Sequence, residues 1–112
     1  MSRLNPKVQK ALDELLSTIE NSEEYIEYKR MKLKIDNDDE LYSQVKRAQD
    51  IRGILHTINE NETGSEYAER IADEYENLCE NTFVYEYLRA EVMMGEMVRE
   101  ILGGIVETTE LA

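Results

Sequence analysis

The apolar residues of this chain recur at intervals of three and four along most of its length. Such intervals place side chains on one face of an α-helix, whereas a half-buried β-strand needs strict alternation. Pro6 is the only proline and there are five glycines, so few residues interrupt the helical spacing. No segment alternates as a strand would, and we therefore predict an all-α fold.

Two short helices are expected first. Asn5 and Pro6 are residue types preferred as the cap and as the first position of a helix. The second helix begins either at Ser22 or at a capping box formed by Asn21 and Glu24.

A long antiparallel helical hairpin is expected to follow, built from the third helix and the last two. The third helix starts from a capping box of Asn37 with Glu40 and ends at about residue 59. The loop at residues 59–65 is short enough to fold the next helix back, and Ser65 is the predicted cap of that helix.

The last two helices are expected to be separated by a break or kink at Asn81 or Thr82. The final helix carries a wide apolar stripe and is expected to fade at Gly103 and Gly104, before a polar tail.

The length and charge of the chain restrict its class. One domain is expected over residues 1–112, with frayed ends at 1–4 and 107–112. There are 25 Asp and Glu residues against 13 Lys and Arg, a net charge of −12. Direct binding to nucleic acid or to an anionic membrane is disfavoured, because both rely on basic surfaces. One cysteine, with no signal peptide and no membrane-length apolar run, predicts a cytoplasmic protein.

The predicted hairpin is extended, and it buries less apolar surface than a compact bundle of the same mass. Self-association is the simplest way to cover the remainder, so a homodimer or higher oligomer is expected. Met93, Met94 and Met97 lie on the last helix, where they form either a partner contact or an ordinary core edge. The residues predicted for the interface are Tyr28, Tyr87, Glu91, Met94, Val98, Ile101 and Ile105.

Glu91 lies in register with Tyr87 and Met94 on the stripe of the last helix. An unpaired carboxylate is costly to bury. Glu91 therefore either pairs with a cation from another helix or subunit, or lies at the edge of the stripe, and we favour pairing.

Acidic residues recur along the predicted fourth helix at intervals of three and four. Carboxylates with this spacing can bind a divalent cation, and helical nucleotide pyrophosphohydrolases use an E-x-x-E and a later E-x-x-D in this way. Here the second pair has the reversed order and lies too near the first, so we favour a solvated face. A metal-dependent hydrolase stays an alternative function, and no catalytic residue, metal or cofactor is expected. The five acids are Glu66, Glu69, Asp73, Glu76 and Glu80.

Basic residues are concentrated in the second and third helices, and RNA binding through them is a further alternative. Cations flanked by acids usually form ion pairs on a solvated face, which is the interpretation we favour. The seven are Lys29, Arg30, Lys32, Lys34, Lys46, Arg47 and Arg52.

Catalysis by a nucleophile and a base is disfavoured, because His56 is the only histidine and no Ser or Cys lies in a recognisable nucleophile elbow. We expect His56 at the surface or at its boundary, and Cys79 buried and inert.

The helix starts and apolar positions between residues 8 and 106 follow one pattern. It consists of Ser22-Glu23-Glu24-Tyr25-x-x-Tyr28, Asn37-Asp38-x-Glu40-Leu41, Val45, Gln49 and Asn81-x-x-Val84-x-x-Tyr87-Leu88-x-Ala90-Glu91, followed by Met94, Val98, Ile101 and Ile105. In this order and spacing the chain resembles the YlbF/YmcA (YheA-like) family.

The resemblance implies a small, all-helical, cytoplasmic protein of Gram-positive bacteria that associates with itself or with other family members. It also implies a regulatory or adaptor role. YlbF and YmcA, with a third protein, form a complex that influences RNase Y-dependent maturation of messenger RNA, and through it competence, sporulation and biofilm formation. The chain lacks the cysteine-rich C-terminal tail of YlbF, so an iron–sulfur cluster attributed to that complex could draw at most Cys79 from this chain, and not without a partner.

Overall fold

The computed structural model describes residues 3–61 and 65–111. Over these residues the chain is all-helical and contains no strand, which confirms the predicted fold class. The helices are α1 (Pro6–Glu20), α2 (Glu23–Asp36), α3 (Asp39–Asn61), α4 (Glu66–Cys79) and α5 (Thr82–Thr109).

Short polar side chains start all five helices by accepting a hydrogen bond from a backbone N–H of the first turn. The predicted caps Asn5 and Ser65 are confirmed. Where two starts were possible, Ser22 caps α2 and Asn81 caps α5.

The start of α3 differs from the predicted capping box of Asn37 with Glu40. Asp38 is the capping residue, because its Oδ1 accepts hydrogen bonds from the backbone N–H groups of Glu40, at 3.0 Å, and Leu41, at 3.1 Å. Asn37 ends α2 instead, and its own N–H donates to the carbonyl of Leu33 at 3.2 Å.

The prediction that the last helix fades at Gly103 and Gly104 is wrong. α5 continues through both glycines to Thr109, into the segment expected to fray. Helix propagation is cooperative, so a long helix tolerates two residues that each cost about 1 kcal/mol. The helix ends where Glu110 adopts a left-handed conformation with φ of 57°.

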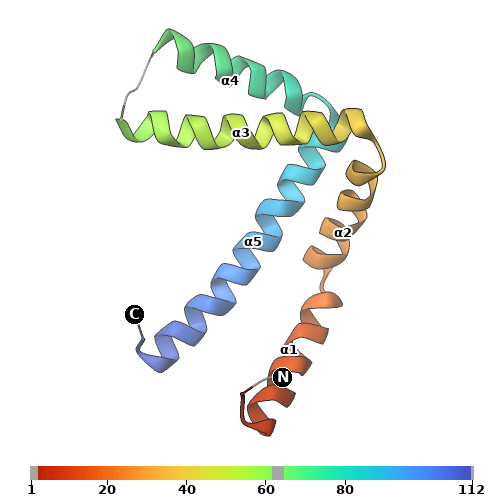
Figure 1. Ribbon diagram of the computed structural model, residues 1–112, viewed down its shortest axis with the longest axis vertical. Helices are drawn as coiled ribbons and strands as arrows, with labels where there is room; N and C mark the ends of the chain where they lie inside the picture. The colour runs from red at the N-terminus through yellow and green to blue at the C-terminus, as the bar shows by residue number, and fades with distance from the viewer. Residues whose placement is uncertain (1–2, 62–64, 112) are drawn as a thin grey trace.

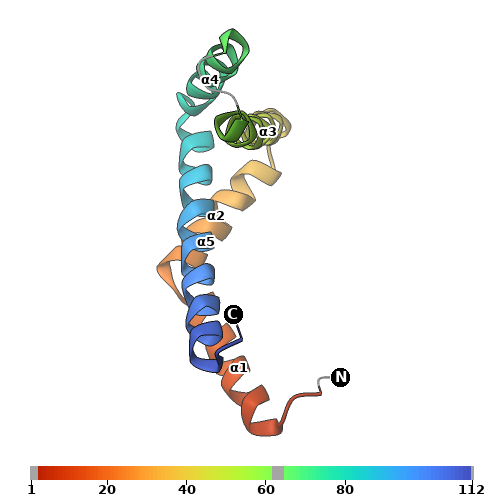
Figure 2. The same ribbon diagram turned by 90° about the vertical axis from the view of Figure 1, so that its left-hand side faces the viewer.

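The helices form two antiparallel pairs that lie crosswise. α4 folds back along α3, and α5 then leaves this pair to run antiparallel to α2 (Figure 1). A view turned by 90° shows α3 nearly end-on while α5 runs along the long axis (Figure 2). The last helix therefore does not extend the hairpin as expected, because the chain turns at Glu80 and Asn81. α5 packs more extensively on α2 than on α3 or α4.

The main hydrophobic core lies where α2, α3 and α5 meet. Met31 of α2, Ala48 of α3 and Val84 of α5 are 0% exposed. The core cluster at this junction consists of Met31, Ile35, Val45, Ala48, Val84, Tyr87, Leu88 and Ala90.

The chain is more open than a compact protein of its size. Its radius of gyration is 18.2 Å, against about 13 Å for a compact chain of this length. Its accessible surface is 8648 Å², against about 6,400 Å² for a compact monomer of this mass. No helix of the described residues is both long and apolar enough to cross a bilayer.

The core assignment predicts different outcomes for two neighbouring residues of α2. Met31→Ala should lower the free energy of unfolding by about 2–5 kcal/mol, because it leaves a cavity in a fully buried site. Leu33 is 65% exposed, so Leu33→Ala should change it by less than about 0.5 kcal/mol. Urea unfolding followed by circular dichroism at one fixed protein concentration measures both, and equal effects would contradict the core described here.

Candidate interaction surface

One face of α5 is apolar over its whole length but is covered over only its first half. Val84 is fully buried there by α2 and α3. Leu102 lies about five turns further on, in the same direction from the helix axis, yet it is 54% exposed. Ile105, on the same face, is 49% exposed. The second half of α5 thus continues the core face beyond the helices that cover it.

A second uncovered apolar face lies on α1. Val8, Leu12 and Leu16 are 52%, 37% and 46% exposed, and no residue of α1 is buried. In the described part of the chain α1 contacts α2 and makes no contact with α5. We call this face, made of Val8, Leu12, Leu15, Leu16 and Ile19, the α1 stripe, and the face of α5 made of Met94, Val98, Ile101, Leu102, Ile105 and Val106 the α5 stripe.

The residues predicted for the interface fall into two groups. Tyr28 and Tyr87 pack on each other inside the chain, with ring centroids 5.9 Å apart, and Tyr87 is buried. Met94, Val98 and Ile101 are half-buried and Ile105 is exposed, and all four lie on the α5 stripe. The interface predicted from the sequence did not include Leu102 or any residue of the α1 stripe. The sequence shows that Leu102 and the α1 stripe lie on apolar helix faces, but helical spacing alone does not indicate which apolar faces stay exposed.

The buried position of Tyr87 beside Tyr28 changes the pKa of the Tyr87 hydroxyl group. Burial, together with the hydrogen bond to Tyr28, raises the pKa of the Tyr87 hydroxyl above its usual range. The unfolded chain therefore releases this proton at lower pH than the folded chain.

This shift predicts a loss of stability in alkali. The contribution of Tyr87 is complete below its unfolded pKa of about 10 and is lost as the pH rises above it. Tyr87→Phe should therefore flatten the alkaline fall in the urea midpoint, whereas Tyr85→Phe, at an exposed position, should leave it as in the wild type. Urea midpoints across a series from neutral to alkaline pH measure this, and parallel curves for the two variants would contradict it.

Glu91 is paired, as predicted. Its Oε1 accepts a hydrogen bond from Nη2 of Arg52 at 2.7 Å, and its Oε2 accepts one from Nε2 of Gln49 at 2.9 Å. Both donors belong to α3, so the cation comes from another helix of the same chain. The carboxylate ties α3 to α5 at the point where the covered half of the α5 face ends.

A double-mutant cycle tests this tie. Arg52→Met combined with Glu91→Gln should show a coupling free energy of about 1 kcal/mol, because the carboxylate is partly desolvated and accepts two hydrogen bonds. The matched control is the exposed pair of Glu27 with Arg30 within α2, for which about 0.3 kcal/mol is expected. Urea unfolding of the four chains of each cycle gives the values, and equal coupling in the two cycles would refute the tie.

The basic residues are engaged within the chain. Arg30, Lys32, Arg47 and Arg52 form ion pairs. The ammonium groups of Lys34 and Lys46 lie over aromatic rings, at 4.9 and 5.4 Å from the centroids. Six of the seven residues in the basic set thus have a partner in the chain, which leaves less of it to bind phosphate.

The acidic residues of α4 face solvent. All five carboxylates of the predicted run are exposed, and the described residues contain no group of three or more His, Cys, Asp or Glu placed to hold a metal ion. Glu74, on the same helix, forms a two-bond ion pair with Arg47 of α3, which lowers the pKa of its carboxyl group. His56 is exposed, as predicted, and Cys79 is half-buried rather than buried.

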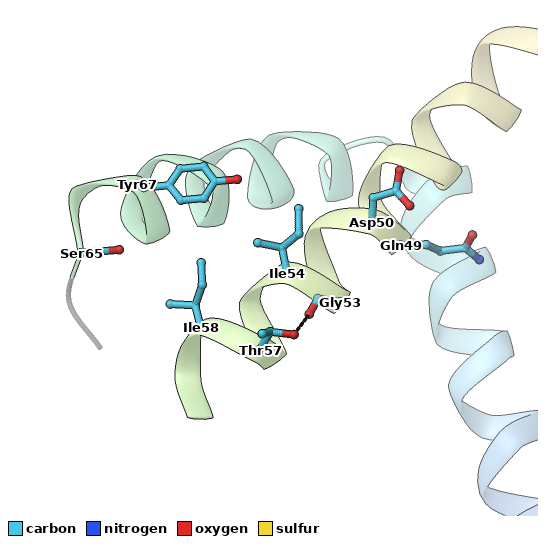
Figure 3. Close-up of a pocket in the computed structure, with 8 residues that line it drawn as sticks. All are labelled: Gln49, Asp50, Gly53, Ile54, Thr57, Ile58, Ser65 and Tyr67. Atoms are coloured by element: carbon cyan, nitrogen blue, oxygen red, sulfur yellow. Dashed lines mark hydrogen bonds between the residues drawn. The ribbon is translucent and has the colours of Figure 1, made fainter. Parts of the chain in front are cut away.

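A hollow of about 620 Å³ lies between α3 and α4. Figure 3 shows Ile54 and Ile58 of α3 pointing toward Tyr67 of α4, with Asp50 at one end. The hydroxyl of Thr57, also in the lining, donates to the carbonyl of Gly53 on its own helix at 3.1 Å. The ionisable groups in this lining, Asp50 and Tyr67, form neither a metal-ligand set nor a pair of nucleophile and base.

The described structure defines a class: a small all-helical protein, open in shape, with two apolar stripes that are only partly covered. The comparison with family models makes the assignment more specific. Residues 8–108 match the family described as control of competence regulator ComK, YlbF/YmcA. The chain therefore belongs to the YlbF/YmcA family, as its helix starts and stripes predicted. Searches of curated proteins and of solved structures gave no match.

Proposed function

We propose that this chain is a non-enzymatic regulatory adaptor that acts by binding other proteins. The observation that carries the proposal is the exposure of two apolar stripes, on α1 and on the second half of α5, in one open chain. Each square ångström of apolar surface removed from water contributes about 25 cal/mol, so covering these stripes with a partner stabilises the complex.

The cellular process proposed for this chain is based on the description of its family. Its description names control of the competence regulator ComK. We propose that the chain takes part in RNase Y-dependent maturation of messenger RNA in the cytoplasm, and thereby affects competence, sporulation or biofilm formation. Its proposed partners are a second copy of itself, other family members and proteins of the RNA-processing complex.

The two alternatives have less support. A hydrolase needs carboxylates that converge on an ion, whereas the acids of α4 point into solvent along one helix. An RNA-binding surface needs cations free to meet phosphates, whereas most of the basic set is engaged with acids and rings. Both alternatives can be tested together with the adaptor role.

Complementation in the native host separates the three functions. Cells lacking the chain should accumulate unprocessed RNase Y-dependent transcripts, which transcript-end mapping detects. The wild type, Glu69→Gln and Lys29→Glu should restore processing, whereas Leu102→Glu with Ile105→Glu should not, because charges on the α5 stripe prevent docking.

Leu33→Glu is the matched control, since it places a charge on an exposed leucine outside both stripes. Circular dichroism should show that every variant stays helical. Loss of complementation by Glu69→Gln would favour the hydrolase, loss by Lys29→Glu would favour RNA binding, and full activity of the double stripe variant would contradict the adaptor role.

A further inference from the structure

The α1 stripe and the α5 stripe match in length. α1 has 15 residues, which span about 22 Å at 1.5 Å per residue. The α5 stripe from Met94 to Val106 spans about 20 Å by the same measure. Both are apolar and only partly covered, and within the chain the two helices do not pack on each other. Each stripe therefore has the length and the apolar character needed to cover the other.

The charges at the ends of these helices are opposite. Arg3 and Lys7 lie at the start of α1, whose first turn has no acid. Glu107 and Glu110 lie at the end of α5, whose last turn has no base. Each set is unfavourable for its own helix, because the N-terminus of a helix carries partial positive charge and the C-terminus partial negative charge. Each set becomes favourable where the two helix ends meet.

We propose that the two stripes pack against each other between two copies of the chain. The α1 of one copy lies antiparallel along the second half of α5 of the other, and the same contact recurs in the opposite sense, as two-fold symmetry requires. This arrangement brings the basic start of α1 to the acidic end of α5. The inference rests on the proposed function only in taking a second copy as a partner.

The area is sufficient. The chain exposes roughly 2,000 Å² more surface than a compact monomer of its mass, and stable homodimers bury a total of about 2,000–5,000 Å² over both partners. The excess on two chains, roughly 4,000 Å², lies in that range. The net charge of −12 on each chain is screened beyond about 8 Å at physiological ionic strength, so the charges at the contact matter most.

The junction between α1 and α2 favours contact with a second copy over closure within one chain. The Ser22 hydroxyl donates to the carbonyl of Ile19 in α1, at 2.6 Å, and accepts from the N–H of Tyr25 in α2, at 3.2 Å. The Asn21 amide donates to the carbonyl of Ser17 at 2.7 Å. These bonds hold the turn through which α1 leaves α2, apart from α5 (Figure 1). Closing α1 onto its own α5 would require a change in this capped turn.

Charge reversal at the two helix ends tests the proposal. One chain carries Arg3→Glu with Lys7→Glu, a second carries Glu107→Lys with Glu110→Lys, and a third carries all four changes. Each pair of changes improves the match of its own helix to the helix dipole, so lost association cannot come from a lost helix. Sedimentation velocity or light scattering of the full chain over a concentration series gives the dimer dissociation constant.

We expect each two-site variant alone to raise the dissociation constant at least about tenfold, because both reciprocal contacts become repulsive. An equal mixture of the two should restore wild-type association, and so should the four-site chain. Equal charge changes elsewhere, Lys29→Glu with Arg70→Glu and Asp73→Lys with Glu76→Lys, should leave the constant within about threefold.

Four results would overturn the inference, and they are distinguishable. A monomeric wild type removes self-association from the proposed function as well. A wild-type dimer that is insensitive to the reversals leaves the adaptor role intact and rejects only this contact. Restoration in the four-site chain without restoration in the mixture indicates closure within one chain. Equal weakening by the control pairs indicates a general effect of net charge.

Discussion

Burial of the first half of α5 against α2 and α3 is the interaction on which the rest of the structure depends. It joins segments at opposite ends of the chain around three fully buried side chains, Met31, Ala48 and Val84. α1 has no buried residue, and α4 supplies no buried member of this cluster, although Tyr75, Leu78 and Cys79 pack against it. Without the junction, α3 and α4 would form only an isolated helical hairpin, and α5 would have no fixed direction.

The same junction decides which surfaces stay open. α5 has 28 residues and α2 has 14, so an antiparallel α2 can cover only about half of the α5 face. α1 would have to continue along α5 to cover the rest, but the capped turn at Asn21 and Ser22 directs it away. The bonds from Gln49 and Arg52 to Glu91 lie at the boundary between the covered and uncovered halves.

Local features of this fold were predictable from the sequence, and its long-range geometry was not. Caps such as Asn5 and Ser65 satisfy N–H groups two or three residues away, so composition and spacing predict them. The pairing of Glu91 followed from the cost of a lone carboxylate on an apolar face. The direction of α5 depends on the angle at Asn81, which a capping residue does not determine. The exposure of the α1 stripe depends in turn on where α5 goes.

One helix face thus serves in two ways. The buried half of α5 anchors the helix, and because helix formation is cooperative, the anchor also keeps the second half helical across Gly103 and Gly104. Docking onto a preformed helix avoids the free-energy cost of ordering a disordered segment, which takes a few kcal/mol from a coupled folding and binding reaction. A chain with a modest core can therefore present an ordered apolar surface, and this combination suits a protein that works by association.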